Sequence, residues 1–400
     1  MPYQKLDVTT CADYLKSIGI FERSAPLITR EVGDGNINLV FVIQNPVGRR
    51  SVVIKQALPY VRCVGESWPL DLGRTVREGR ALEIQNRLAP GLVPAVLKAD
   101  EEMALIVMED LSHLEVMRGG MIRMQRYPKF ADHISTLMAN LAFYTSDLFM
   151  NPQEKKELVK QFINPELCEI CEDLVFTDPY HDSHRNNINP ALRSYIQEVF
   201  WRKPALRLEA AKYKYKFLTE AQSLVHGDLH IGSIFADAEN TKAFDPEFAY
   251  FGPTAYDPGK LIGNLFINYI SWDGKPYPLD QVRDYREYLL RTTIDIYDLF
   301  ESKFLTNWDK DARDIITSIP GYREYYMHNL LIDTVAFAGI VMIRRVHGLA
   351  HNKDVDGIED LMKRRDVQVK ILEMGEQLIM NRNSFSSIGQ VSAFIKTRLF

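Results

Sequence analysis

Two short motifs, His226-Gly227-Asp228-Leu229-His230 and Asp245-Pro246-Glu247, decide how this chain is expected to fold. The first places a carboxylate between two imidazoles, and the second adds a pair of carboxylates further along the chain. Between them, two short β-prone runs, 234–235 and 241–244, flank a turn-rich segment at 237–240. This pattern predicts a strand–turn–strand hairpin, which would bring Asp228 and Asp245 to the same end of one cleft.

Carboxylates arranged in this way suit phosphoryl transfer, a reaction in which the protein mainly positions the reactants and neutralises charge. Asp228 is placed to orient or deprotonate an attacking hydroxyl. Asp245 and Glu247 are placed to hold Mg²⁺, which prefers hard oxygen ligands. Pro246 is expected to restrict the backbone of Asp245 to an extended form. The alternative interpretation is three surface acids around an ordinary hairpin, and the N-terminal part of the chain argues against it.

A glycine-rich segment, Gly33-Asp34-Gly35-Asn36, lies near the N-terminus. It leads into the apolar run 39–43, and after a turn a second strand-like run, 51–55, ends at Lys55. Glycines let backbone amides approach phosphate oxygens, and a lysine on the following strand can pair with the α- and β-phosphates. The segment follows neither a Walker motif nor the full protein-kinase glycine pattern. Together with the distant carboxylates, it predicts a nucleotide site without naming a subclass.

The region between these motifs follows the order of a kinase. Residues 71–88 are expected to form a helix that carries Glu78 and Glu83, either of which could pair with the strand lysine; we favour Glu78. Residues 103–108 are expected to form a buried strand that ends in the polar connector Glu109-Asp110-Leu111. A connector in that position could offer backbone groups of Glu109 and Leu111 to an adenine bound between two lobes.

The order of these motifs resembles that of the protein-kinase-like small-molecule kinases, which include aminoglycoside phosphotransferases, choline kinases and 5-methylthioribose kinases. The similarity to the 5-methylthioribose kinase family is greatest at 33–36, 226–233 and 245–250, and it extends over nearly the whole chain. The resemblance implies an α+β, two-lobed fold with a small antiparallel-sheet N-lobe and a larger, mainly helical C-lobe. It also implies ATP with Mg²⁺, S-methyl-5-thioribose phosphorylated at its 1-hydroxyl in methionine salvage, and a homodimer.

The resemblance also implies roles for individual residues. Asp228 corresponds to the catalytic base, Asp245 and Glu247 to magnesium ligands, and Lys55 to the phosphate-binding lysine. Asp257 corresponds to an aspartate that braces the catalytic loop.

One position departs from the wider pattern. Most of these kinases have an asparagine five positions after the base, whereas this chain has Ser233. A serine can still contact Mg²⁺, but it is a weaker ligand. The metal is therefore expected to depend more on Asp245 and Glu247.

The substrate pocket must hold a neutral sugar with a small apolar tail. Trp68, in a loop before the expected helix at 71–88, is one candidate to close over the sugar. Arg344 and Arg345 are further candidates. They follow the apolar run 333–343, which is expected to be buried, and two adjacent charges there need a compensating partner. The resemblance implies a twin arginine at this place that binds substrate and stabilises the transferring phosphoryl group. The alternatives are a tryptophan packed between lobes and a salt-bridged or snorkelling arginine pair.

Composition agrees with a cytoplasmic enzyme. The chain has 400 residues, of which 46% are hydrophobic, and a net charge of −5. That charge argues against a nucleic-acid partner, because such domains are usually basic. No charged-then-apolar N-terminal segment indicates a signal peptide. The most hydrophobic run, 330–346, contains Asp333 and ends in two arginines, so we expect a core helix and no membrane span.

We expect residues 1–110 to form the nucleotide-binding N-lobe, and residues 111–400 to form the C-lobe with the catalytic loop, metal site and substrate pocket. Helices are expected at 11–20, 130–150, 190–200, 205–219, 279–303, 322–347 and 355–380. Two other functions remain open, namely a related kinase acting on an aminoglycoside, choline or homoserine, and a nucleotide-binding pseudokinase. The intact Lys55, Asp228 and Asp245 argue against the pseudokinase.

Overall fold

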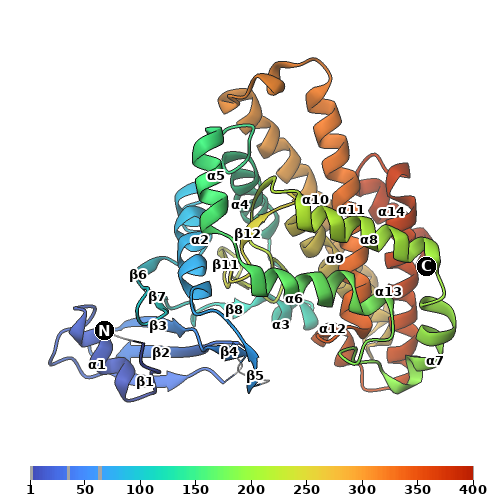
Figure 1. The fold of residues 1–400 in the computed structure, drawn as a ribbon. Coiled ribbons are helices and arrows are strands. Elements are labelled where there is room, and N and C mark those ends of the chain that lie inside the picture. The colour runs from blue at the N-terminus through green and yellow to red at the C-terminus, as the bar shows by residue number, and fades with distance from the viewer. Residues whose placement is uncertain (1–2, 34–36, 62–64, 400) are drawn as a thin grey trace.

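The computed structural model describes residues 3–33, 37–61 and 65–399. Asp34, Gly35 and Asn36 of the expected phosphate loop lie outside the described residues, as does the side chain of Trp68. The described chain forms a small part built on a five-stranded sheet and a larger helical part (Figure 1). This confirms the expected α+β fold, with a small antiparallel-sheet lobe and a larger, mainly helical lobe.

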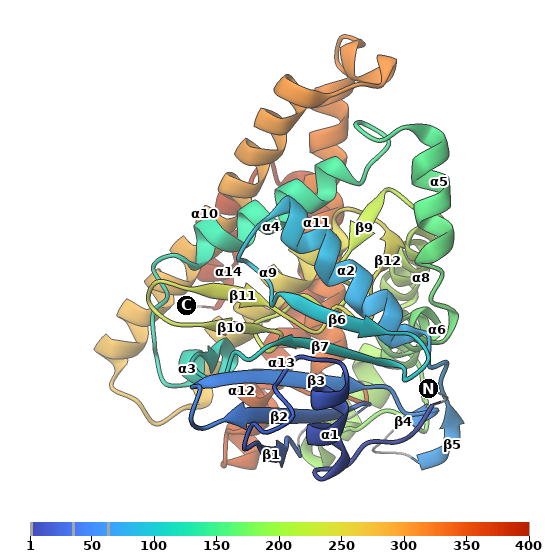
Figure 2. The ribbon, with the colours of Figure 1, turned by 90° about the vertical axis from the view of Figure 1, so that its left-hand side faces the viewer.

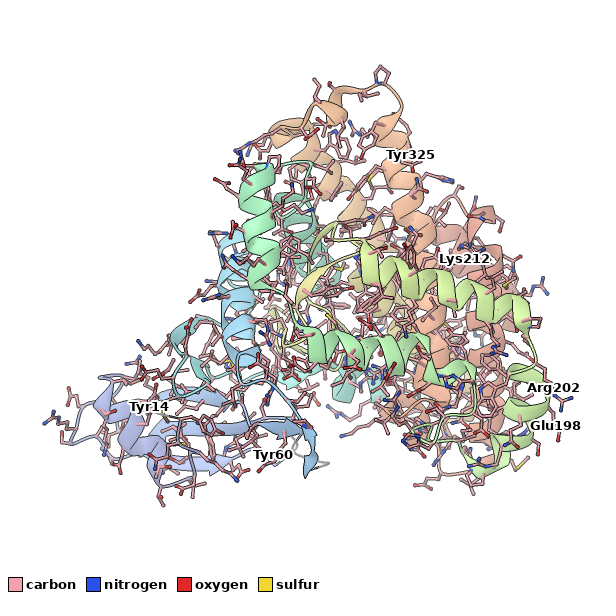
Figure 3. The ribbon with its side chains drawn as sticks, viewed as in Figure 1. Tyr14, Tyr60, Glu198, Arg202, Lys212 and Tyr325 are labelled. Carbon is pink, nitrogen blue, oxygen red and sulfur yellow. The ribbon has the colours of Figure 1, made fainter. Side chains whose placement is uncertain are left out.

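The N-terminal sheet is antiparallel, with the strand order β1-β2-β3-β7-β6. It comprises β1 (Ile28–Glu31), β2 (Leu39–Asn45), β3 (Arg50–Gln56), β6 (Val96–Asp100) and β7 (Leu105–Glu109), and is covered by α1 (Thr10–Ser17) and α2 (Arg74–Leu88). The β2–β3 turn closes because the side chain of Asn45 accepts hydrogen bonds from the backbone of Val47 and Gly48. Tyr14 lies on α1, as Figure 3 shows. Its hydroxyl ties the helix to the sheet edge by donating to Asp100 over 2.8 Å.

Side chains alternate along each strand, and this alternation decides what each face of the sheet contacts. On β7, Leu105 belongs to a small core with α1, whereas the next residue, Ile106, packs on the opposite face next to α2. On β3, Ile54 belongs to the α1 side. Lys55 therefore points towards the face that α2 covers.

The larger lobe is built around α4 (Phe130–Tyr144), α9 (Tyr256–Ser271), α10 (Leu279–Asp311), α11 (Tyr322–His347) and α13 (Leu361–Asn381). Glycines let α11 approach two neighbours closely. A Cβ on Gly263 of α9 would lie 2.7 Å from the backbone oxygen of Ala338, and one on Gly339 of α11 would lie 2.5 Å from that of Gly375 in α13. By length and composition α11 could cross a membrane, yet 78% of its most hydrophobic stretch is buried in the protein. The expected core helix is confirmed.

Shorter elements complete the fold. The remaining helices are α3 (Met117–Ile122), α5 (Pro152–Gln161), α6 (Pro165–Phe176), α7 (Arg193–Tyr195), α8 (Pro204–Thr219), α12 (Lys353–Asp356) and α14 (Ile388–Leu399). Single turns of 3₁₀ helix lie at Asp178–Tyr180, Pro190–Leu192, Trp272–Gly274, Ile315–Ser318 and Arg382–Ser384, and a π turn lies at Ile196–Phe200. The remaining strands are β4 (Tyr60–Val61), β5 (Gly65–Pro69), β8 (Glu115–Val116), β9 (Ser223–Val225), β10 (Ile234–Ala236), β11 (Thr241–Ala243) and β12 (Tyr250–Gly252).

The β10–β11 hairpin lies at the boundary of the two lobes. Figure 2 shows it next to β6 of the N-terminal sheet. The backbone N–H of Ala243 donates to Leu92 over 2.9 Å, and Nζ of Lys242 donates to both carboxylate oxygens of Glu109. The C-lobe hairpin is thereby attached to the segment before β6 and to the last residue of β7.

Two expected helices are interrupted. The helix expected at 355–380 consists of α12 and α13, because Asp360 accepts hydrogen bonds from the backbone of Met362 and Lys363 and so begins a new helix. The helix expected at 190–200 begins as a 3₁₀ turn and ends as a π turn. Other helices end a few residues away from the expected positions: α1 at Ser17, α4 at Tyr144 and α10 at Asp311.

Candidate active site

The two motifs are brought together by paired strands. The loop 226–233 joins β9 to β10, and the loop 244–249 joins β11 to β12. β10 pairs with β11, and β9 pairs with β12, so the expected hairpin is confirmed. Nε2 of His226 lies 3.0 Å from the backbone oxygen of Phe244, which places the motifs in direct contact.

The backbone is unusual at both motifs. Gly227 has a φ of 80°, and a Cβ there would lie 2.2 Å from the backbone oxygen of Phe248, so this position requires glycine. Asp245 has a φ of 67°, in the left-handed region. The prediction that Pro246 restricts the backbone of Asp245 to an extended form is therefore wrong. The carboxylate of Asp245 contacts Nζ of Lys55, and this tertiary contact outweighs the local preference that a following proline imposes.

Asp228 is surrounded by basic side chains. Its Oδ1 lies 2.5 Å from Nζ of Lys260 and 3.9 Å from Nη2 of Arg345, and its Oδ2 lies 3.4 Å from Nε2 of His230. Burial alone would raise the pKa of Asp228, but Lys260, His230 and Arg345 together hold it well below its usual range. Burial lowers the pKa of His230 to about 4, so this imidazole is neutral at physiological pH. The carboxylate of Asp228 is therefore ionised and ready to accept a hydrogen bond.

The beginning of α9 contacts the backbone of the loop 226–233. Asp257 accepts hydrogen bonds from the backbone N–H groups of His226, over 2.6 Å, and Gly227, over 3.0 Å. These contacts confirm the bracing position expected for Asp257. Lys260 follows one turn later and donates to the backbone oxygen of Gly227 over 2.8 Å. Sequence reasoning missed Lys260, although a single lysine within the apolar run 258–267 was a signal of the same kind as the arginine pair.

Lys55 lies among three carboxylates. Its Nζ is 2.9 Å from Oε1 and 2.8 Å from Oε2 of Glu78, contacts Asp245, and is 3.8 Å from Oε2 of Glu247. The preference for Glu78 over Glu83 is confirmed, since Glu83 is exposed to solvent on α2. Burial opposes the charge of Lys55, but the three carboxylates outweigh burial and raise its pKa. Lys55 therefore stays protonated.

This acidic cluster is suited to a divalent cation. Glu78, Asp245 and Glu247 have oxygen atoms within 4.8 Å of one another. Burial, reinforced by the neighbouring carboxylates, raises the pKa of Glu78 to about 8 and that of Glu247 to about 6, so Lys55 alone does not compensate the three crowded carboxylates. The side chain of Asp245 is 41% exposed and that of Glu247 is 7% exposed, so Asp245 is the more accessible of the two. Such a set of donors fits Mg²⁺.

Glu247 is positioned by residues that sequence reasoning did not single out. Nδ2 of Asn38 donates to Oε2 of Glu247 over 2.6 Å. Oδ1 of Asn38 accepts from Nε and Nη2 of Arg74, over 3.2 and 2.7 Å, and Arg74 is 1% exposed. No local sequence signal distinguishes this buried arginine in the first turn of α2 from a solvated one.

Arg344 and Arg345 lie at the C-terminal end of α11, and both are 8% exposed. Among the described residues, no group hydrogen-bonds to Nε of either side chain. An unsatisfied buried donor costs about 1–3 kcal/mol, which favours a ligand that supplies an acceptor. Burial, together with the charge of Arg344, lowers the pKa of Arg345 to about 9, so it remains protonated near neutral pH. The structure places Arg345 next to Asp228, as a substrate-binding role would require.

The remaining residues expected at the site are Ser233, Glu109, Leu111 and Gly33. The hydroxyl of Ser233 donates towards Asp228 and His230 backbone oxygens and accepts from the His230 N–H over 2.9 Å, which leaves one lone pair of the oxygen. Glu109 and Leu111 lie at the end of β7 and just after it, and the Glu109 carboxylate is paired with a lysine of the hairpin. At Gly33, an added Cβ would meet nothing within 4 Å.

Comparisons with known proteins agree with this geometry. Residues 29–294 match the phosphotransferase enzyme family. The chain is 44% identical over 383 residues to the methylthioribose kinase of a Geobacillus species, covering 96% of this chain and 93% of that protein. It is 46% identical over 370 residues to the methylthioribose kinase of Geobacillus kaustophilus, covering 92% and 91%. It is 41% identical over 400 residues to that of Bacillus velezensis, covering 99% and 98%.

Proposed function

Since this chain belongs to the methylthioribose kinase family of phosphotransferases, we propose that it transfers the γ-phosphoryl group of ATP to the 1-hydroxyl of S-methyl-5-thioribose. The products would be S-methyl-5-thioribose 1-phosphate and ADP, within methionine salvage. The observation that carries the proposal is the direct contact between two loops. In the first loop, Asp228 is paired with Lys260. In the second loop, Asp245 and Glu247 lie next to Lys55.

Asp228 orients and deprotonates the acceptor hydroxyl. Its Oδ2 accepts a hydrogen bond from the 1-hydroxyl and so directs an oxygen lone pair at phosphorus. The low pKa of Asp228 makes it a weak base, so the proton moves late, after most of the bond to the leaving ADP has broken. That order suits the loose transition state of phosphoryl transfer.

Asp245 and Glu247 would hold magnesium, and Ser233 can add its remaining lone pair. When bound, the metal neutralises the charge of the β- and γ-phosphates. Lys55, held by Glu78 over 2.8–2.9 Å, points its ammonium at the same phosphates. Gly33-Asp34-Gly35-Asn36 covers the phosphates, and backbone groups of Glu109 and Leu111 bind the adenine.

Arg344 and Arg345 bind the acceptor and the group in transfer. Their Nε donors have no hydrogen-bond partner among the described residues, and Nη2 of Arg345 is 3.9 Å from the carboxylate proposed to receive the hydroxyl proton. A guanidinium placed there can stabilise charge on the transferring phosphoryl oxygens. Trp68 would close over the sugar, as the resemblance to the family implies.

Residues 1–110 and 111–400 act as the two lobes of this kinase, with the nucleotide between them. We also propose that the protein works as a cytoplasmic homodimer on a small-molecule substrate. Size-exclusion chromatography with light scattering would test the homodimer, and a single species of 46.1 kDa would contradict it.

ADP release from the purified protein tests the reaction. The assay contains MgATP with methylthioribose, ribose, choline, homoserine or kanamycin at equal concentrations. We expect turnover above the water background with methylthioribose alone. Turnover restricted to another acceptor would keep the roles of Asp228, Asp245 and Glu247 and would reject the salvage substrate.

A further inference from the structure

Lys260 is buried in an apolar helix and yet carries a charge. It is 1% exposed, and every residue of α9 around it is buried. Removing an ammonium group from water costs several kcal/mol unless partners compensate for the lost solvation. The partners of Lys260 are the backbone oxygen of Gly227 at 2.8 Å and Oδ1 of Asp228 at 2.5 Å, and its Nζ lies 5.2 Å from the centre of the Tyr256 ring. Its polar contacts thus belong to the catalytic loop.

These contacts constrain the carboxylate of Asp228 from one side. Lys260 occupies Oδ1, while Oδ2 faces the neutral imidazole of His230 at the longer distance of 3.4 Å. A carboxylate offers about four lone-pair positions, so Oδ2 keeps room for the acceptor hydroxyl. The side chain of Asp228 is 25% exposed, so part of this carboxylate is open to solvent.

The competing partner of Asp228 is Arg345. Its Nη2 lies 3.9 Å from the same Oδ1, so a carboxylate freed from Lys260 could rotate towards the guanidinium. That rotation would turn the accepting oxygen away from the substrate and would occupy an arginine proposed to bind it. Lys260 therefore competes with Arg345 for the same oxygen of the Asp228 carboxylate.

We propose that Lys260 is a positioning residue for phosphoryl transfer, which fixes the Asp228 carboxylate so that Oδ2 receives the acceptor hydroxyl. The inference rests on the proposed role of Asp228. Asp257 and Lys260 would then divide one task, since Asp257 binds the N–H groups of the loop whereas Lys260 binds its carbonyl and its carboxylate.

Two substitutions separate the charge of Lys260 from its size. Lys260→Met keeps the volume and removes both polar contacts. Lys260→Gln keeps an amide that can donate to Gly227 and removes the charge. A displacement of about 1 Å at the reacting atoms can cost 10²-fold in rate. We therefore expect both variants to lower kcat with methylthioribose by about 10²-fold, with KM and Kd for MgATP within about twofold of the wild type.

Lys155→Met is the matched control. Lys155 is also buried, at 4% exposure, and also pairs with a carboxylate, that of Asp147, and with the backbone oxygen of Ala221 at 2.7 Å. It lies on α5, and none of its partners belongs to the two motifs. This variant should lose stability in the same way as Lys260→Met and keep its kcat. An equal loss of kcat in Lys155→Met would assign the effect to packing and overturn the proposal.

A double-mutant cycle with Asp228→Asn supplies the decisive readout. Residues that act through one group are non-additive. If Lys260 acts through Asp228, adding Lys260→Gln to Asp228→Asn should change kcat by less than threefold. Fully additive losses, or a kcat of Lys260→Gln within threefold of the wild type, would refute the positioning role. If the wild-type protein showed no turnover on methylthioribose, the proposed function would be rejected instead. Failure of the positioning role and failure of the proposed function are therefore distinguishable.

Discussion

The side-chain amide of Asn38 donates a hydrogen bond to Oε2 of Glu247 over 2.6 Å, although 209 positions separate the two residues. Asn38 lies just before β2 in the N-terminal lobe, and Glu247 lies in the second motif of the C-lobe. Arg74 completes this connection by holding the oxygen of the Asn38 amide. The orientation of a proposed magnesium ligand therefore depends on how the N-terminal lobe is placed.

Asn38→Ala should weaken magnesium-dependent nucleotide binding, because Glu247 loses the donor that orients it. A hydrogen bond to a charged group contributes about 1.5–3 kcal/mol, which corresponds to a rise of roughly ten- to hundredfold in KM for MgATP. ADP release titrated against MgCl₂ measures the change. Asn189→Ala, which removes an amide bonded to Gln368 at 2.9 Å, is the control. An unaltered magnesium requirement in Asn38→Ala would contradict the linkage.

Asp228→Ala should lower kcat by about 10²–10⁴-fold, the range expected for loss of a general base, while MgATP still binds. The nucleotide contacts proposed for Lys55, Asp245 and Glu247 do not pass through Asp228. Single-turnover kinetics measures the effect on phosphoryl transfer, and isothermal titration with nucleotide measures the effect on MgATP binding. Asp182→Ala changes an exposed aspartate and should behave as the wild type. A reduction of less than tenfold in Asp228→Ala would exclude it as the base.

Glu78→Ala and Glu83→Ala should differ sharply, although both residues lie on α2. Glu78 is 1% exposed and pairs with buried Lys55, whereas Glu83 is exposed. Removing one partner of a buried ion pair costs roughly 3–5 kcal/mol. Since Asp245 still contacts Lys55, we expect the lower end, about 3 kcal/mol, from urea unfolding, with a higher KM for ATP. Equal stability of the two variants would show that the Lys55–Glu78 pair does not hold α2 in place.

The stability of the protein should fall as pH falls from about 6.5 to about 4. His347 is buried at 0% exposure, its Nε2 lies 2.6 Å from the backbone oxygen of Pro179, and burial lowers its pKa to about 4. Between those pH values the unfolded chain binds a proton at this position that the folded chain does not. His347 therefore contributes roughly 3 kcal/mol to the free energy of unfolding. This contribution is complete above about pH 6.5 and is lost as the pH falls towards 4.

His347→Gln tests this assignment, because its amide can donate to Pro179 without titrating. Urea unfolding of both proteins between pH 4 and pH 7 measures how the free energy of unfolding depends on pH. We expect this dependence to have a shallower slope in the variant. His181→Gln, at an exposed imidazole, should leave the wild-type slope unchanged. Parallel slopes for the wild type and His347→Gln would remove His347 as the source of the acid sensitivity.

The sequence by itself determined the elements that depend on local pattern. Alternation and turn residues predicted the β2–β3 and β10–β11 hairpins, and both are present because strand pairing across a short turn involves near neighbours. The same pattern placed Lys55, Asp228, Asp245 and Glu247 on the loops and strand where they are found. The apolar run of α11 also predicted a buried helix, since hydrophobicity alone drives burial.

Only the tertiary structure decided which partners these residues have. Glu78 and Glu83 look alike in sequence, but at 3.6 residues per turn they lie on different faces of α2, and docking on the sheet selects one face. The left-handed backbone of Asp245 follows from its contact with Lys55, against the preference that Pro246 imposes. Arg74 and Lys260 acquire their partners from distant segments. Side-chain pairing across lobes depends on the packing of whole helices and sheets, which no local pattern encodes.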